Sequence, residues 1–211
     1  PQAPAGPRPS RALPYELSTL WEAQAGAASL AATRVALTFG NTGRQAAVFH
    51  VYDRNNLVAV PRRYTVEAGK SLSDTWAPAL GGAYDLWVLG PNGFHRHFTG
   101  SALRAAAAGQ PRPDVHVTCD GSTAELVLRY VNAGTAPCTF TLSANAYVTT
   151  TRTHMVAARG ELTVRLPVTA SDCWYDFSVK VTGHPEYVRR FAGRVGTGRH
   201  TVSDPALGRR A

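Results

Sequence analysis

The sequence has few of the residues that build covalent or metal-linked frameworks. Its 211 residues include 3 cysteines, Cys119, Cys138 and Cys173, and all of them lie in the second half of the chain. Three thiols cannot pair completely, and none of them stands in a CxxC or another zinc-site spacing. A disulfide-dense or zinc-stabilised fold is therefore excluded.

One disulfide is still compatible with this count. Cys119 with Cys138 is our first choice, because one follows a short predicted strand and the other precedes a strand after a turn. The alternative is that each is buried as a small apolar side chain.

Long apolar runs and enzyme signatures are absent as well. No run of 18 or more apolar residues occurs, and the N-terminus lacks the apolar segment of a signal peptide. We expect a soluble fragment, and an export signal of the parent protein would lie upstream of Pro1. No HExxH, GxSxG, GxxxxGK[ST] or GxGxxG motif is present, so we expect neither catalysis nor a cofactor in this chain.

Two histidines, His95 and His97, are candidate metal ligands. His95 and His97 share one side of a predicted strand, but the second copy of the repeat described below has Val188 and Arg190 at those places. Because the pair is not part of the shared fold, we favour solvent-facing histidines and predict no metal site.

The formal net charge is +8, yet it is spread unevenly. Residues 14–103 and 113–203 are nearly neutral, and most of the excess lies in arginines of the predicted linkers and tail. Scattered linker arginines are weak support for a binding surface, so we disfavour nucleic acid as a partner.

The sequence does contain an internal duplication, with three phrases repeated about 91 residues apart. They are Phe39–Gly43 with Tyr130–Gly134, Tyr84–Leu86 with Tyr175–Phe177, and Phe94–Gly100 with Tyr187–Gly193. A unit of this length can bury a core of its own. We therefore predict two domains, 14–103 and 113–205, with linkers at 1–13 and 104–112 and a tail at 206–211.

Each copy is patterned as strands. Short runs rich in aromatic and β-branched residues alternate with turns rich in Gly, Asn and Pro, and no long amphipathic helix competes with them. Roughly seven short strands in about 90 residues are typical of an immunoglobulin-like sandwich. The predicted fold is all-β, with two tandem immunoglobulin-like β-sandwich domains.

The alternation also predicts which side chains face inward. Tyr84, Leu86 and Val88 share the core side of one strand, and Asp85 lies on the other side. Tyr84 and its counterpart Tyr175 are placed like the tyrosine corner of immunoglobulin-like domains, and plain core packing is the alternative.

Two features are candidates for contact with a lipid or a partner. Arg189, Arg190, Arg194 and Arg199 form the densest basic group, which suits phosphate head groups, and a solvated edge strand is the alternative that we favour. Trp87 lies on the predicted outer side and would suit a partner or a lipid interface, although we favour burial between the two domains.

Several longer phrases resemble a known family. Ala83–Arg96, Trp174–Val179, and Arg189–Val195 with Ser203–Pro205 are similar to the duplicated C-terminal domain of bacterial phosphatidylcholine-preferring phospholipases C. The resemblance runs from about Tyr15 to Gly208. It implies a secreted parent enzyme whose N-terminal catalytic domain, of the alkaline-phosphatase-like kind, hydrolyses phosphatidylcholine or sphingomyelin.

That catalytic domain is not in this chain, so the resemblance carries over no catalytic or metal-binding residue. The partners it implies are the catalytic domain of the same polypeptide and a phospholipid surface or an accessory protein. We expect a non-catalytic region that aids membrane or substrate recruitment. The alternative is a structural or protein-docking module that stabilises the catalytic domain.

Overall fold

The computed structural model describes residues 6–24, 34–147 and 150–206. The first five residues of the predicted N-terminal linker and most of the predicted tail, 207–211, lie outside the described residues. Within these described residues the first repeat contributes seven strands to its sandwich: β2 (Leu17–Gln24), β3 (Arg34–Asn41), β4 (Ala47–Asp53), β5 (Arg62–Val66), β6 (Lys70–Trp76), β7 (Ala83–Leu89) and β8 (His95–Ser101).

The second repeat contributes the same number. Its strands are β9 (Pro113–Asp120), β10 (Glu125–Asn132), β11 (Cys138–Ala146), β12 (Thr151–Val156), β13 (Gly160–Pro167), β14 (Trp174–Val181) and β15 (His184–Arg194). A short helix, α1 (Ala102–Ala106), joins the two repeats. No helix in the described part of the chain is long and apolar enough to cross a membrane.

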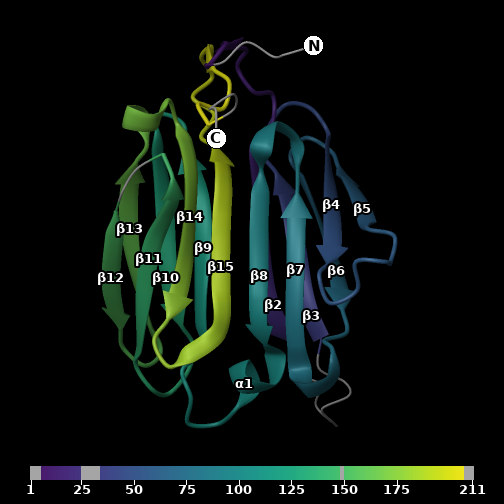
Figure 1. Ribbon diagram of the computed structural model, residues 1–211, viewed down its shortest axis with the longest axis vertical. Helices are drawn as coiled ribbons and strands as arrows, with labels where there is room; N and C mark the ends of the chain where they lie inside the picture. The colour runs from purple at the N-terminus through teal and green to yellow at the C-terminus, as the bar shows by residue number, and fades with distance from the viewer. Residues whose placement is uncertain (1–5, 25–33, 148–149, 207–211) are drawn as a thin grey trace.

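In each repeat a sheet of three antiparallel strands faces a sheet of four. The small sheets have the orders β2-β3-β6 and β13-β10-β9. The two larger sheets are fused, because β8 pairs antiparallel with β15, and they form one eight-stranded sheet of order β12-β11-β14-β15-β8-β7-β4-β5. Figure 1 shows β8 and β15 side by side at the centre of the molecule. The predicted all-β sandwich fold is confirmed.

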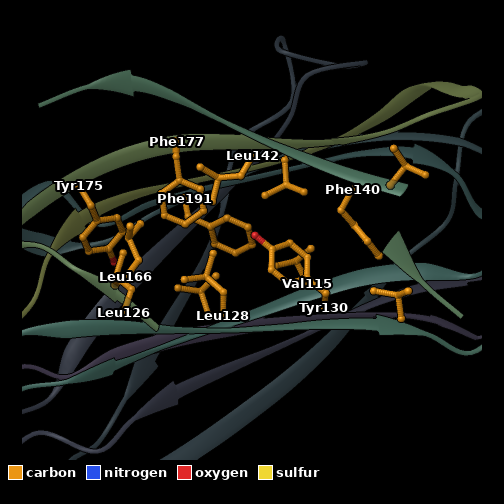
Figure 2. Packing of buried hydrophobic residues seen from close by; sticks show 14 of the residues in the cluster. Val115, Leu126, Leu128, Tyr130, Phe140, Leu142, Leu166, Tyr175, Phe177 and Phe191 are labelled. Atoms are coloured by element: carbon orange, nitrogen blue, oxygen red, sulfur yellow. The ribbon is translucent and has the colours of Figure 1, made fainter. Parts of the chain in front are cut away.

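Each repeat buries its own apolar cluster between its two sheets. In the second repeat Leu126, Leu128 and Tyr130 of β10 meet Phe140 of β11 and Phe177 of β14, and Figure 2 shows these side chains filling the space between the sheets. The first repeat packs an equivalent cluster that includes Trp21, Phe39 and Phe49.

The predicted alternation along β7 is confirmed by burial. Tyr84, Leu86 and Val88 are buried, whereas Asp85 and Trp87 between them are partly exposed. This is the pattern of a strand with one face on the core.

The first repeated phrase builds a turn clamped by a buried asparagine. Asn41 and Asn132 are each 0% exposed, and each accepts a hydrogen bond from the backbone N–H two residues on, at 3.0 Å and 3.1 Å. The Asn132 side-chain amide also donates to the carbonyls of Ala136 and Ala157.

The glycine of the same phrase is required by a close backbone approach. A Cβ on Gly43 would lie 2.4 Å from the carbonyl oxygen of Pro14, and one on Gly134 would lie 2.2 Å from that of Gln110. The repeated phrase therefore forms the same turn in both repeats, and this turn packs against the chain segment that enters each sandwich.

The ends of the described chain meet at one end of the molecule. β1 (Pro9–Ser10) pairs with β16 (Thr201–Val202), so part of the predicted N-terminal linker forms a strand. Arg194 fastens this pair, because its guanidinium donates to the Ser10 hydroxyl and to the carbonyls of Val202 and Arg11.

The expected Cys119–Cys138 disulfide is wrong, since both thiols are free. Cys119 pairs with Leu126 near one end of β9, whereas Pro113 at the other end pairs with Asn132, which leads through a turn to Cys138. Six residues of strand span roughly 20 Å, far beyond the Cα separation that a disulfide allows. Burial raises the pKa of the Cys138 thiol to about 11.

Replacing the turn asparagine should destabilise the second sandwich. We expect Asn132→Ala to lower the free energy of unfolding by about 1–3 kcal/mol, because it leaves buried backbone groups without partners. Urea denaturation measures the change. The matched control is Asn55→Ala, at an exposed loop residue, with an effect within about 0.5 kcal/mol; equal effects of the two variants would contradict the clamp.

Candidate functional site

The contact between the two repeats is a strand pairing with approximate two-fold symmetry. In the pairing of β8 with β15, His97 lies opposite Arg190, Phe98 opposite Arg189, and Phe191 opposite Arg96. The aligned repeats make Arg96 equivalent to Arg189 and Phe98 equivalent to Phe191. We call this pairing the seam.

On the inner side of the seam each repeat inserts a buried arginine toward the tyrosine of the other repeat. Arg96 Nη2 donates to the Tyr175 hydroxyl at 2.9 Å, and Arg189 Nη2 donates to the Tyr84 hydroxyl at 2.9 Å. Each arginine also donates across the seam to a backbone carbonyl, of Ala192 and of Thr99 respectively. The two tyrosines predicted as corner residues therefore bind arginines of the other repeat.

Arg189 is held by charge as well as by hydrogen bonds. It is fully buried, its Nε lies 3.0 Å from a carboxylate oxygen of Asp114, and its guanidinium carbon lies 4.5 Å from the Trp21 ring centre and 4.3 Å from that of Tyr187. Burial alone would lower the pKa of Arg189, but the neighbouring tyrosines and Asp114 raise it overall. The guanidinium therefore stays charged inside the protein.

Arg96 has a less complete set of partners. Its guanidinium carbon lies 4.0 Å from the ring centre of Phe94, and it donates to the carbonyl of His95 in addition to the seam contacts. Its Nε has no hydrogen-bond partner among the described residues. The two arginines thus occupy equivalent positions, but only Arg189 is paired with a carboxylate among the described residues.

These contacts overturn part of the predicted lipid-contact group. Arg189 is 0% exposed and Arg194 is 8% exposed, so neither guanidinium lies on a surface. The alternative of a solvated edge strand is also wrong, because β15 pairs with both β14 and β8. Arg190 is partly exposed and Arg199 is exposed, and a role for them in lipid contact stays a prediction.

On the outer side of the seam the structure brings Trp87 and Arg190 onto one face. Trp87 pairs with His97, and His97 pairs with Arg190, so the two predicted residues stand two strands, or about 10 Å, apart. The expected burial of Trp87 between the repeats is wrong. Its ring is partly exposed and lies under the guanidinium of Arg54, 4.4 Å away, within the first repeat.

Each outer-face carboxylate of the repeated Tyr-Asp phrase holds a basic side chain. Asp85 contacts His97 Nε2 at 2.5 Å and Arg54 at 3.0 Å. The equivalent Asp176 contacts Arg190 at 2.6 Å and 2.8 Å. Burial tends to raise the pKa of Asp176, but the hydrogen bonds from Arg190 and Asn145 outweigh burial and lower it.

The two histidines are partly buried, against the expectation of solvent-facing side chains. Burial, with help from the charge of Arg190, lowers the pKa of His95 to about 4. Burial also lowers the pKa of His97, although its contact with Asp85 opposes the shift. Among the described residues no group of three or more His, Cys, Asp or Glu side chains lies close enough to hold a metal ion.

The sequence predictions missed Arg96, although a signal was present. Arg96 and Phe98 of β8 alternate in phase with Phe94, which immediately precedes the strand, and Tyr187, Arg189 and Phe191 share one side of β15. An arginine that alternates in phase with two core aromatics indicates an inward guanidinium. The density of arginines along the chain does not carry this information.

Removing the buried guanidinium of Arg189 should destabilise the protein strongly. We expect Arg189→Met to lower the free energy of unfolding by about 3–5 kcal/mol, because Asp114 and the Tyr84 hydroxyl lose their partner. Chemical denaturation measures the loss. Arg199→Met, at an exposed arginine, should change it by less than about 0.5 kcal/mol; a similarly small loss for Arg189→Met would contradict the seam as a stabilising contact.

The low pKa of His95 makes stability depend on pH. Between its unfolded value of 6.5 and its folded value of about 4, the unfolded chain binds the extra proton, so the free energy of unfolding falls as the pH is lowered through that range. His95→Val copies Val188 of the second repeat and should flatten the dependence. Urea denaturation at pH values of about 7 and about 5 gives the free energy of unfolding of the wild-type protein and of the variant. An equal change between the two pH values in both proteins would exclude His95 as the source.

Comparison with known proteins identifies the family. The model of the bacterial phospholipase C C-terminal domain matches residues 9–101 and 113–194, which correspond to the two repeats. The chain is 38% identical over 99% of its length to the non-hemolytic phospholipase C of Pseudomonas aeruginosa and 40% identical over 98% to that of Burkholderia pseudomallei. It is 35% identical over 96% of its length to the hemolytic phospholipase C of P. aeruginosa.

The chain spans about 30% of the length of each of these relatives. The resemblance carried by Ala83–Arg96, Trp174–Val179 and Arg189–Val195 is confirmed. The chain belongs to the family of the bacterial phospholipase C C-terminal domain.

Proposed function

We propose that this chain is the non-catalytic accessory region of a secreted bacterial phospholipase C and that it recruits the enzyme to phospholipid surfaces. The observation that carries the proposal is the match of nearly the whole chain to a region described as the C-terminal domain of such enzymes. The parent enzyme would hydrolyse phosphatidylcholine or sphingomyelin to phosphocholine and diacylglycerol or ceramide.

The fused sheet supports a recruiting role because it offers one continuous outer face. Tyr52, Trp87 and His97 stand in one row across β4, β7 and β8, and Arg190 of β15 continues the row. Trp and Tyr side chains favour the boundary between water and lipid, since their rings are apolar and their polar atoms can stay hydrated.

The charges of this face predict what kind of lipid surface it suits. Arg54 and Arg190 are each paired with a carboxylate, Asp85 and Asp176. Paired arginines attract anionic lipid only weakly, because the neighbouring carboxylates cancel their field. We therefore expect binding to zwitterionic phosphatidylcholine with a weak dependence on salt.

The test is sedimentation of the purified chain with vesicles of phosphatidylcholine, alone and with added anionic lipid, at low and high salt. We expect binding to phosphatidylcholine alone and less than about a threefold loss at high salt. Bovine serum albumin serves as the non-binding control. Absence of binding to every vesicle would overturn recruitment and favour the alternative, a module that docks the catalytic domain or an accessory protein.

A further inference from the structure

The connection between β4 and β5 carries the most exposed large apolar side chains in the described part of the first repeat. Val58 is 96% exposed, Val60 is 82% exposed and Leu57 is 60% exposed. Residues 54–60 are all exposed, and Figure 1 shows this connection projecting from the outer edge of the first repeat. Successive large apolar residues at such exposure on one loop are a mark of an interaction site.

The conformation of this loop is fixed by its own hydrogen bonds. Asp53 accepts from the backbone N–H of Asn55 through its side chain, at 2.9 Å, and from that of Asn56 through its carbonyl, at 3.0 Å. Ala59 N–H then donates to the Asn56 carbonyl at 3.2 Å. Two successive turns therefore present Leu57, Val58 and Val60 to solvent.

The base of the loop is held at both ends by an arginine. On one side Arg54 lies over Trp87 and pairs with Asp85. On the other side Arg62 lies 4.8 Å from the ring centre of Trp76 and pairs with Asp74 at 2.8 Å. The apolar tip is thus rimmed by cations that stack on tryptophans.

The shared fold does not require this loop. In the second repeat β11 ends at Ala146 and β12 begins at Thr151, whereas in the first repeat β4 ends at Asp53 and β5 begins later in the chain, at Arg62. The first repeat therefore has the longer connection, and its residues 54–60 are exposed rather than packed in the sandwich core.

We propose that the β4–β5 loop is a membrane anchor, with Leu57, Val58 and Val60 inserting below the head groups of a phospholipid surface. This inference rests on the proposed function and names the element that performs it. Arg54 and Arg62 would lie at the level of the phosphates, where guanidinium groups donate to phosphate oxygens. Tyr52 and Trp87, next along the sheet, would lie at the head-group boundary.

The size of the apolar tip favours lipid over a protein partner. A stable protein interface needs about 800 Å² from each partner, with a broad apolar centre. A tip of four successive residues offers far less than that area. Insertion into a lipid surface needs no matching pocket, and its strength follows the apolar area that is buried.

The test compares a loop variant with a matched control in the sedimentation assay with phosphatidylcholine vesicles. Val58→Asp/Val60→Asp places two charges at the tip and should lower the partition coefficient at least about tenfold. Met155→Asp changes an apolar residue that is 76% exposed on β12 of the second repeat, and it should leave binding within about twofold of wild type. All of these positions are exposed, and the thermal midpoint of each variant checks that it folds.

The outcomes separate this inference from the function on which it rests. If the wild-type chain binds vesicles and the loop variant binds equally well, the anchor is overturned and recruitment by another surface stands. If the wild-type chain binds no vesicle, both fail. Loss of association with the catalytic domain in the loop variant, with vesicle binding intact, would assign the loop to protein docking and would also overturn the anchor.

Discussion

The fused sheet depends on the reciprocal contact between a buried arginine of one repeat and a tyrosine of the other. Arg96 and Arg189 are almost fully enclosed, and a buried guanidinium is costly unless most of its donors are satisfied. Part of that satisfaction comes from across the seam, through the hydroxyls of Tyr175 and Tyr84 and the carbonyls of Ala192 and Thr99. Each repeat has its own apolar core, but without the other repeat its buried arginine would lose these hydrogen bonds across the seam.

The repeated phrase with Tyr84 and Tyr175 positions side chains on both faces of the fused sheet. In each repeat the tyrosine precedes an aspartate that holds a basic residue of the neighbouring strand, His97 in one case and Arg190 in the other. Because strand residues alternate between faces, one short phrase serves both the core and the surface. The seam therefore joins the outer faces of the two repeats, and β5 forms the edge of the joined sheet in the first repeat.

Much of the fold could be predicted from local pattern. The strands, the inward direction of Tyr84 and Leu86 and the duplication all follow from spacing along the chain, and the structure confirms the sandwich. The Cys119–Cys138 bridge failed because two cysteines near neighbouring turns in sequence lie at opposite ends of a sandwich. The surface role of Arg189 failed because β15, taken for an edge strand, pairs with a strand of the other repeat.

The sequence alone determined the strand periodicity, the two copies and the family, because these depend on neighbours within one strand or one phrase. The tertiary structure decided which two strand edges meet, and through them whether each arginine lies in the core or in solvent. The phase of Arg96 and Arg189 with core aromatics was visible in the sequence. Their partners were not, because Tyr175 and Tyr84 lie 79 and 105 residues away and come within reach only when the two sheets join.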